Sequence, residues 1–407
     1  MQYNMKSKYM GYPYLNVKED FPALKRYKAY LNTAAQGLIP KQTSQALKRF
    51  LEKTEKDEWE ELREEIEKPA KREIAKLIGC SDEEVSFSIQ TTDGFRRILL
   101  SIKPKEEGNI VGIDLEFPSI SMAIKTLSQR NHSEIRIVKH RDGRYDILDF
   151  EKLIDEKTYA VIFSSVVWVN GFMLPIREIS EIAHEKGALV IVDGIQHVGA
   201  VNMNVKKLGI DAMAVGGEKW LLNNIIGSGF IYIDKEVIEE LDPPAQTLMN
   251  FQEPLEGWSK WWATIDKDPW IPLEKSKTAS KLDWGGGKPY ILIEALRSSV
   301  EYLNNIGIES IEKHNRALKR KIIEEAEKRG YKVLGCVENE DRWSSITTIS
   351  TGMGYEKEME AVKSMREEGV QVSYRGSSGI GGIRISPHIY NDEIDIEVLF
   401  SKIKEKI

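Results

Sequence analysis

Short apolar runs alternate with amphipathic stretches over most of the chain. The apolar runs have strand-like length and lie at residues 85–89, 109–114, 134–139, 159–165, 188–194, 210–217 and 229–234. Stretches such as 91–102 and 174–187 place apolar residues at helical spacing between them. Continuous apolar strands separated by helices are typical of a mostly parallel sheet that is covered on both faces. The pattern therefore predicts an α/β fold.

Other patterns lie on either side of this alternation. Residues 41–78 predict helix, and Pro69 is expected to interrupt it because proline is disfavoured inside a helix. A stretch rich in Trp and Pro runs from about residue 235 to 283, and a long irregular segment of this kind is usually functional or an interface. Its tryptophans either cover the edge of the core, line the active site or contact a second subunit. Helices are expected over 288–329, followed by strands at 344–350 and 381–386.

Composition excludes several classes of protein. The 407 residues carry a formal net charge of −6 without a basic stripe, which argues against general nucleic-acid binding. The chain has neither the apolar run of a signal peptide nor the ~18 apolar residues of a membrane span. Its two cysteines lack CxxC spacing and its six histidines lack HExxH spacing, so we expect a cytoplasmic protein without a metal site.

Two charged residues lie where such a sheet binds ligands. Asp193 ends the run ALVIV and Lys219 follows the run IDAMAV, and ligands bind at the carboxyl ends of strands. Taken separately, Asp193 could cap a turn and Lys219 could be a solvated loop charge. An enzyme that uses pyridoxal phosphate (PLP) needs a lysine that binds the cofactor and an acid that keeps the pyridine nitrogen protonated. Asp193 and Lys219 are therefore candidates for these two tasks.

The motif VDGIQ-x22-K, which ends at Lys219, resembles the class V aminotransferases of PLP fold type I. That family includes cysteine desulfurases and isopenicillin N epimerase-like proteins. The resemblance extends from LNTAAQGLIP (31–40) to residue 400. It implies that Asp193 pairs with the pyridinium, Gln196 binds the ring hydroxyl and Lys219 forms the Schiff base. It also implies an N-terminal segment that packs on the active site (1–40), a large PLP-binding domain (41–285) and a small C-terminal α/β domain (286–407).

Further cofactor contacts follow from the same resemblance. TTDGF (91–95) matches the phosphate-binding turn, where Thr91 and Thr92 at a helix N-terminus offer hydroxyl and backbone N–H groups. An ordinary helix cap is the alternative for this turn. EFPS (116–119) falls where the family carries the aromatic residue that stacks on the ring, so Phe117 is the candidate. A core phenylalanine is the alternative at that position.

Substrate contacts are expected near the C-terminus. Arg384, in GGIRISPHIYN, resembles the arginine that binds the substrate carboxylate, and a guanidinium suits a carboxylate because it donates two parallel hydrogen bonds. A surface ion pair is the alternative for Arg384. Arg375 and Asn32 are weaker candidates for substrate binding.

The chain departs from the family pattern at the phosphate. Relatives often carry serine and histidine just before the lysine, whereas this chain has Gly216, Gly217 and Glu218. It also has Gly286, within a GGG run, where relatives often have a threonine. Arg96 or Arg97 is hypothesised to supply the lost positive charge.

Two other departures concern the substrate. The stretch 373–384 has no cysteine, which disfavours a cysteine desulfurase. Trp168 falls roughly where relatives place a polar residue near the ring hydroxyl, unless the alignment slips and Asn170 takes that role.

The sequence therefore predicts a PLP-dependent enzyme that acts on an amino acid through Lys219, with class V aminotransferase chemistry. The alternatives are a PLP-dependent lyase or epimerase of the same family, or a non-catalytic relative with a degraded phosphate site. The resemblance implies a homodimer with active sites at the subunit boundary. A nicotinamide enzyme is rejected because GSSGIGGIR (376–384) leads into a strand and not into a helix.

Overall fold

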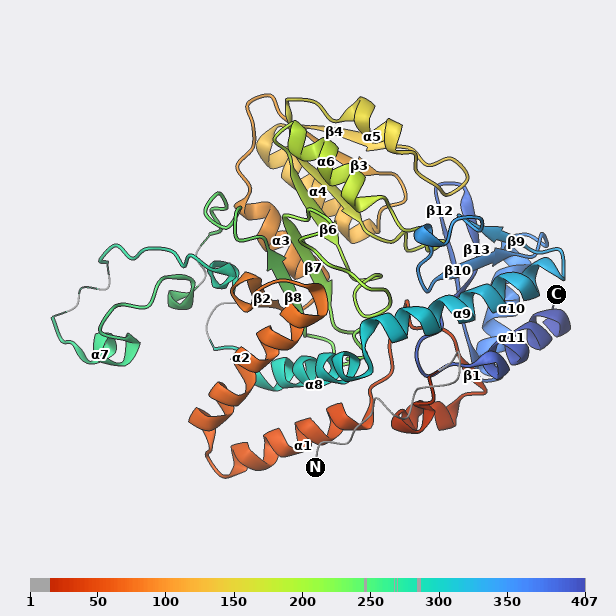
Figure 1. The fold of residues 1–407 in the computed structure, drawn as a ribbon, viewed down its shortest axis with the longest axis horizontal. Coiled ribbons are helices and arrows are strands. Elements are labelled where there is room, and N and C mark those ends of the chain that lie inside the picture. The colour runs from red at the N-terminus through yellow and green to blue at the C-terminus, as the bar shows by residue number, and fades with distance from the viewer. Residues whose placement is uncertain (1–14, 245–246, 267, 269, 284–286, 407) are drawn as a thin grey trace.

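A seven-stranded sheet lies at the centre of the computed structural model (Figure 1), which describes residues 15–244, 247–266, 268, 270–283 and 287–406. The order across the sheet is β2 (Val85–Ser88), β8 (Gly229–Ile233), β7 (Ala212–Gly216), β6 (Leu189–Asp193), β5 (Thr158–Ser164), β3 (Asn109–Ile113) and β4 (Glu134–Val138). Neighbouring strands are parallel except that β8 is antiparallel to β7 and to β2. The prediction of a mostly parallel sheet is confirmed.

Both faces of this sheet are buried by helices. In β6, Ile191 belongs to the core cluster on the side of α3 (Thr91–Ser101) and α4 (Pro118–Asn131). Its neighbours Val190 and Val192 belong to the cluster on the opposite face, with α5 (Ile147–Leu153) and α6 (Ile176–Glu185). Because successive strand residues point to opposite faces, burial on both sides requires the uninterrupted apolar runs seen in the sequence.

Three helices pack together below the sheet in Figure 1: α1 (Lys41–Glu55), α2 (Trp59–Ile78) and α8 (Tyr290–Ile306). The expected interruption at Pro69 is wrong, because Pro69 lies inside α2. The helical conformation is interrupted instead between α1 and α2, where Asp57 has a φ of 61°. Ile66 and Ala70, on either side of the proline, are buried in the core, and this packing offsets the hydrogen bond that proline removes.

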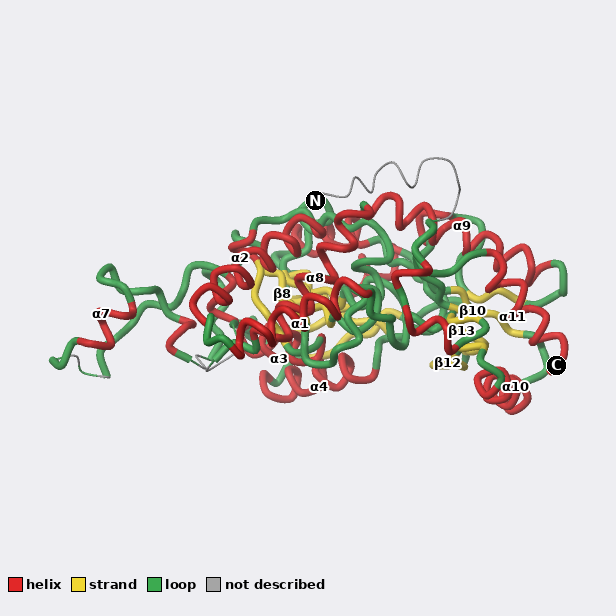
Figure 2. The backbone as a smooth tube through the Cα atoms, turned by 90° about the horizontal axis from the view of Figure 1, so that it is seen from below, coloured by secondary structure: helices red, strands yellow, loops and turns green. Residues whose placement is uncertain are grey.

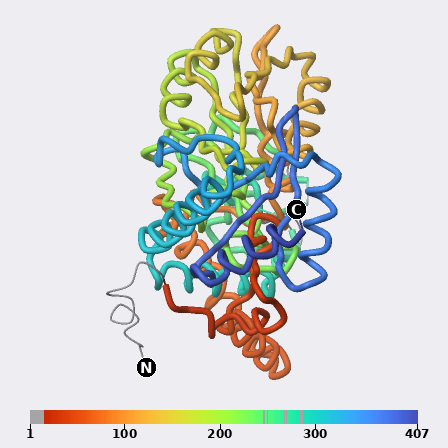
Figure 3. The backbone as a smooth tube through the Cα atoms, turned by 90° about the vertical axis from the view of Figure 1, so that its right-hand side faces the viewer, coloured from red at the N-terminus to blue at the C-terminus, as the bar shows by residue number. Residues whose placement is uncertain are grey.

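A second, antiparallel sheet has the order β12 (Ser373–Ser377), β13 (Ile380–Ile385), β10 (Thr347–Ser350) and β9 (Lys332–Leu334). It packs with α9 (Ile308–Glu327), α10 (Tyr355–Glu367) and α11 (Glu393–Lys406). The early strand β1 (Ala29–Tyr30) pairs with β11 (Val370–Gln371), so residues near the start of the described chain lie beside the C-terminal part (Figure 3). The domain boundaries at 40/41 and 285/286 stay a prediction. None of the helices in the described ranges combines the length and apolar character needed to cross a membrane.

An arm around α7 (Trp258–Ala263) extends away from the rest of the molecule in two views (Figures 1 and 2). Trp261 contacts both Trp258 and Trp262 edge to face. Trp262 is 64% exposed and Trp270 is 90% exposed. These two tryptophans therefore do not cover the edge of the core.

Candidate active site

The carboxyl ends of β5, β6 and β7 meet at one edge of the large sheet, and Asp193 is the last residue of β6. Its side chain is buried, and its Oδ1 accepts a hydrogen bond from the backbone N–H of Ile195 at 2.9 Å. Burial raises the pKa of Asp193 to about 6, although the Ile195 hydrogen bond and the charge of Lys219 oppose this rise. A carboxyl group of this kind gains much from a cationic partner, because it is charged at neutral pH but poorly solvated.

Lys219 follows β7 by three residues and is half-buried. Burial lowers the pKa of its amine to about 8, against the effect of Asp193 and with the help of the Arg384 charge. Its loop is held by the N-terminal segment, since the Gly37 N–H donates to the Glu218 carbonyl at 2.8 Å. A Cβ on Gly37 would lie 2.1 Å from the Lys219 carbonyl oxygen, so this close approach requires glycine. A lysine with a lowered pKa is a usable nucleophile near neutral pH.

Phe117 directly precedes α4 and presents its ring to the same space. The Lys219 Nζ lies 5.6 Å from the centre of this ring. The Phe117 side chain is 38% exposed, so the alternative of a core phenylalanine is wrong. Its ring meets that of Trp168 edge to face, with centroids 5.6 Å apart. The exposed face leaves room for a planar ligand beside the lysine amine.

Glu116 is a site residue that the sequence analysis missed. Its buried carboxyl accepts hydrogen bonds from the backbone N–H groups of Phe117 and Ser164, both at 2.7 Å, and from the Ser164 hydroxyl. Ser164 lies opposite Asp193 in the pairing of β5 with β6. Burial raises the pKa of Glu116 to about 7, and the charge of Asp193 adds to the rise. The signal in the sequence was an acid two residues after the apolar run 109–114.

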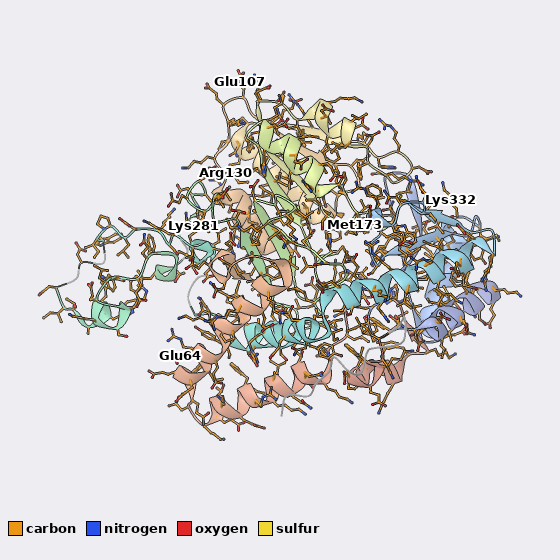
Figure 4. All side chains as sticks on the ribbon, in the orientation of Figure 1. Glu64, Glu107, Arg130, Met173, Lys281 and Lys332 are labelled. Carbon is orange, nitrogen blue, oxygen red and sulfur yellow. The ribbon has the colours of Figure 1, made fainter. Side chains whose placement is uncertain are left out.

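Gln196 lies close to Asp193 but its side chain is already engaged. Its Nε2 donates to the Ala34 carbonyl at 3.0 Å, and its Oε1 accepts from the Trp220 indole at 2.7 Å. One N–H of the amide remains for a ligand. Trp220 and Ala34 belong to a small apolar cluster against which Met173, labelled in Figure 4, packs.

The expected phosphate turn lies at the start of α3. The buried Thr91 hydroxyl oxygen accepts from the Gly216 N–H at 2.9 Å, which ties this turn to the end of β7. Thr92, the next residue, is exposed. The structure thus places the N-terminus of an eleven-residue helix beside the strand end that leads to Lys219.

Glu218 faces this turn. A Cβ on Gly216 would lie 2.3 Å from the Glu218 Oε2, so the carboxylate rests against the Gly216 backbone. Its charge raises the pKa values of both Asp193 and Lys219. The carboxylate is therefore turned toward the site.

The two arginines of α3 are held elsewhere. Arg97 is buried and donates to the carbonyls of Phe87 at 3.0 Å and Leu282 at 2.7 Å, and to Asp93. These contacts give Arg97 a structural role, which contradicts its hypothesised role at the phosphate. The Arg96 side chain is 61% exposed and pairs with Asp93 at 3.1 Å. Of the GGG run, Gly285 and Gly286 lie outside the described residues.

Arg384 lies on β13 and is buried. Its Nη1 donates to the Trp168 carbonyl at 2.9 Å, and its Nε has no hydrogen-bond partner within the described residues. Burial lowers its pKa to about 9. The alternative of a surface ion pair is therefore wrong. Ser373, opposite Arg384 on β12, donates to the Asn32 Oδ1 at 2.6 Å, so Asn32 also lies at this end of the site.

The aminotransferase class-V family model matches residues 29–399. The chain belongs to this family. It is 24% identical over 388 residues to an uncharacterized aminotransferase, YcbU, of Bacillus subtilis (strain 168), covering 95% of this chain and 96% of that protein. It is 26% identical over 399 residues to a probable cysteine desulfurase of Aeropyrum pernix, covering 93% of this chain and 90% of that protein.

Solved structures show the same fold. The apo cysteine desulfurase of Thermococcus onnurineus NA1 superposes with a TM-score of 0.80 at 20% identity, covering 96% of each chain. A C-DES mutant with glycine covalently linked to its PLP cofactor superposes with a TM-score of 0.81 at 17% identity, covering 95% of this chain and 98% of that one. The predictions of fold type I and, at the level of the family, of a PLP-dependent enzyme are confirmed. The roles of individual residues stay predictions.

The residues at this edge fit PLP well at its ring. A lysine with a lowered pKa, a buried acid and an exposed aromatic face converge there, and the Trp168 Nε1 is a buried donor without a partner in the described part of the chain. At the phosphate end, Thr91 and the start of α3 fit an anion, whereas Glu218 opposes it.

Proposed function

We propose that this protein is a PLP-dependent aminotransferase that transfers the amino group of an amino acid. The observation that supports it is the placement of the Lys219 amine 5.6 Å from the centre of the exposed Phe117 ring, with the Asp193 carboxyl at the neighbouring strand end. PLP, when bound, supplies an electron sink that stabilises negative charge at the substrate α-carbon.

Each protein group then has a distinct task. Asp193 holds a proton on the pyridine nitrogen, and the cationic partner lowers the raised pKa of this acid. Lys219 would hold the cofactor aldehyde, and its amine, when free, would move a proton at the substrate α-carbon. Phe117 covers one face of the ring and excludes water from it.

Substrate binding is assigned to the opposite end of the site. Arg384 holds the substrate carboxylate, since its buried guanidinium donates to the Trp168 carbonyl while its Nε has no hydrogen-bond partner among the described residues. Desulfurase chemistry is disfavoured because residues 373–384 contain no cysteine, and Cys336 lies beyond β9. A lyase or an epimerase would use the same residues, and the similarity to an aminotransferase over 95% of the chain favours transamination.

The proposal includes a cytoplasmic homodimer. The exposed tryptophans of the α7 arm support a subunit contact, because large apolar side chains are rarely left in water on an extended segment.

The test uses the purified protein supplied with PLP. Lys219→Ala is expected to abolish the visible absorption of lysine-bound cofactor and its fixation by borohydride, whereas Lys207→Ala, a change at an exposed lysine, is expected to retain both. Peptide mass analysis of the reduced wild type should locate the modification at Lys219.

A panel of amino acids then tests the reaction. Transamination predicts a lasting conversion to the aminated cofactor and release of the matching oxo acid. Cofactor fixation at another lysine would contradict the proposed site, and release of ammonia without an aminated cofactor would favour a lyase.

A further inference from the structure

The β12–β13 hairpin places two arginines on one face. Ser373 is directly opposite Arg384, and Arg375 is directly opposite Gly382. Directly opposite residues share a face, as do residues two apart along a strand, so Arg375 and Arg384 are diagonal neighbours. Their opposite residues, Gly382 and Ser373, are small. No bulky side chain therefore stands directly opposite either arginine, and the Cα atoms of such diagonal neighbours lie roughly 7–8 Å apart.

Neither arginine is neutralised by an acid within the described residues. Arg384 donates to the Trp168 carbonyl, and Arg375 donates to the carbonyl of its neighbour Tyr374 at 2.7 Å. Burial lowers the pKa values of both groups, and each charge also lowers the pKa of Lys219. Both positive charges therefore act on the space in front of the lysine amine.

An open cavity of about 660 Å³ adjoins Arg375 and Trp168. Its walls are the turn between β12 and β13 and the side chains of Tyr355, Met359 and Tyr374. Trp168 connects this cavity to the proposed site, because its ring contacts Phe117 and its carbonyl accepts from Arg384. Trp168 is thus shared by the cavity beside Arg375 and by the proposed site.

We infer that the substrate is an amino acid whose side chain carries a second carboxylate, with Arg384 binding one carboxylate and Arg375 the other. The inference rests on the proposed function, which assigns the α-carboxylate to Arg384. Two separated cations without acids of their own match a dianion, since each forms charge-assisted hydrogen bonds that a neutral side chain cannot replace.

The test measures binding without chemistry. Glutarate and succinate carry two carboxylates and no amine, and pentanoate and butyrate are monocarboxylates of the same lengths. With PLP-supplied wild-type protein, isothermal titration calorimetry is expected to show that a dicarboxylate binds about 10- to 100-fold more tightly than its monocarboxylate, because a hydrogen bond to a charged group is lost.

Arg375→Gln is expected to remove this preference and to leave monocarboxylate binding unchanged. Arg375→Lys keeps the charge but not the paired donors, and it should retain part of the preference. This variant keeps the inference testable if Arg375→Gln does not fold. The matched control is Arg366→Gln, which removes an equal charge from α10, where the side chain bonds Gln371. This control should keep the full preference.

Several outcomes would overturn the inference. These are equal binding of the two ligand classes by wild type, an equal loss in Arg366→Gln, or an Arg375→Gln defect confined to PLP affinity, which would assign Arg375 to the phosphate. Cofactor content is measured by absorbance in every sample. A failure of the proposed function appears there as missing lysine-bound PLP, whereas a failure of this inference leaves bound PLP intact.

Discussion

The ring end and the phosphate end of the proposed cofactor site differ in the charge that they present. At the ring end, Asp193 lies buried on β6 and the Lys219 amine faces Phe117, an arrangement that matches the chemistry of both partners. At the phosphate end, the Thr91 turn offers donors, but the Glu218 carboxylate lies against Gly216. Every charged group named at the ring end suits the cofactor, whereas the phosphate end combines donors that attract an anion with a carboxylate that repels it.

This difference follows from what each end has to do. The ring end takes part in bond breaking, so the identity of each side chain there determines the reaction. The phosphate end only holds the cofactor, and backbone N–H groups at the start of α3 can do this without particular side chains. We therefore expect changes at the ring end to act on turnover, and changes at the phosphate end to act on PLP affinity.

The largest expected effect follows from Asp193→Asn. The amide cannot hold the pyridine nitrogen protonated, so turnover should fall by about 10²- to 10⁴-fold, the range of a lost acid–base function. The free energy of unfolding should increase in this variant. Burial raises the pKa of Asp193 from its ordinary 3.8 to about 6, so its carboxylate costs folding free energy that grows as the pH rises from about 4 to about 6. Above pH 6 the cofactor-free variant should be more stable than the cofactor-free wild type by about 1–3 kcal/mol, whereas bound PLP would offset the cost in the wild type.

Turnover of the PLP-supplied protein and urea unfolding of the cofactor-free protein, each at pH 4, 6 and 8, measure the two effects. Asp341→Asn, a change at an exposed acid, serves as the control and should alter neither quantity. A variant that loses turnover and stability together at pH 8 would show that Asp193 is structural.

The second expected effect is at the phosphate end. Glu218→Gln keeps the shape of the side chain and removes its charge, so PLP affinity should rise about tenfold, the effect of removing a like charge from a partly screened site. Turnover at saturating PLP should stay close to that of wild type. Equilibrium dialysis at low and high salt measures the gain, which should shrink at high salt. Weaker PLP binding by Glu218→Gln, with normal binding by the exposed control Glu239→Gln, would show that Glu218 assists the cofactor.

Much of the ring end could be predicted because it depends on strand ends. Burial on both faces of the sheet requires continuous apolar runs, and an acid or a lysine that follows such a run stands out, as Asp193 and Lys219 do. Glu116 was missed because an acid after a strand usually caps a turn. Its environment depends on Ser164, from a strand 48 residues away, and no local pattern records that contact.

The phosphate end could not be predicted to the same depth. The missing serine and histidine were visible in the sequence, but the direction of the Glu218 side chain depends on the loop that Gly37 holds in place. Arg97 likewise had helical spacing suited to an anion site, and only the carbonyls of Phe87 and Leu282 show that its guanidinium is used elsewhere.

The third prediction concerns pH. Burial lowers the pKa of Lys219 to about 8, so the unprotonated amine becomes the main form only above that pH. The rate of covalent PLP capture should therefore rise about eightfold between pH 7 and pH 8.5, and level off above. Stopped-flow absorbance measures this profile. Asp193 opposes the lowering, so Asp193→Asn should move the midpoint to lower pH. A capture rate that is independent of pH across this range would contradict the lowered pKa.

The smallest expected effect is that of Arg96→Ala. Arg96 lies little more than one helical turn after Thr91. Its side chain is 61% exposed and pairs with Asp93, so solvent and this carboxylate screen its charge from the phosphate site. PLP affinity should fall by no more than about twofold, and salt should erase the difference, because an exposed charge contributes little. Equilibrium dialysis at two salt concentrations measures it, with Arg177→Ala, at an exposed arginine on α6, as the control. A loss above tenfold would mean that Arg96 leaves Asp93 to reach the phosphate, and would make the phosphate end as dependent on side chains as the ring end.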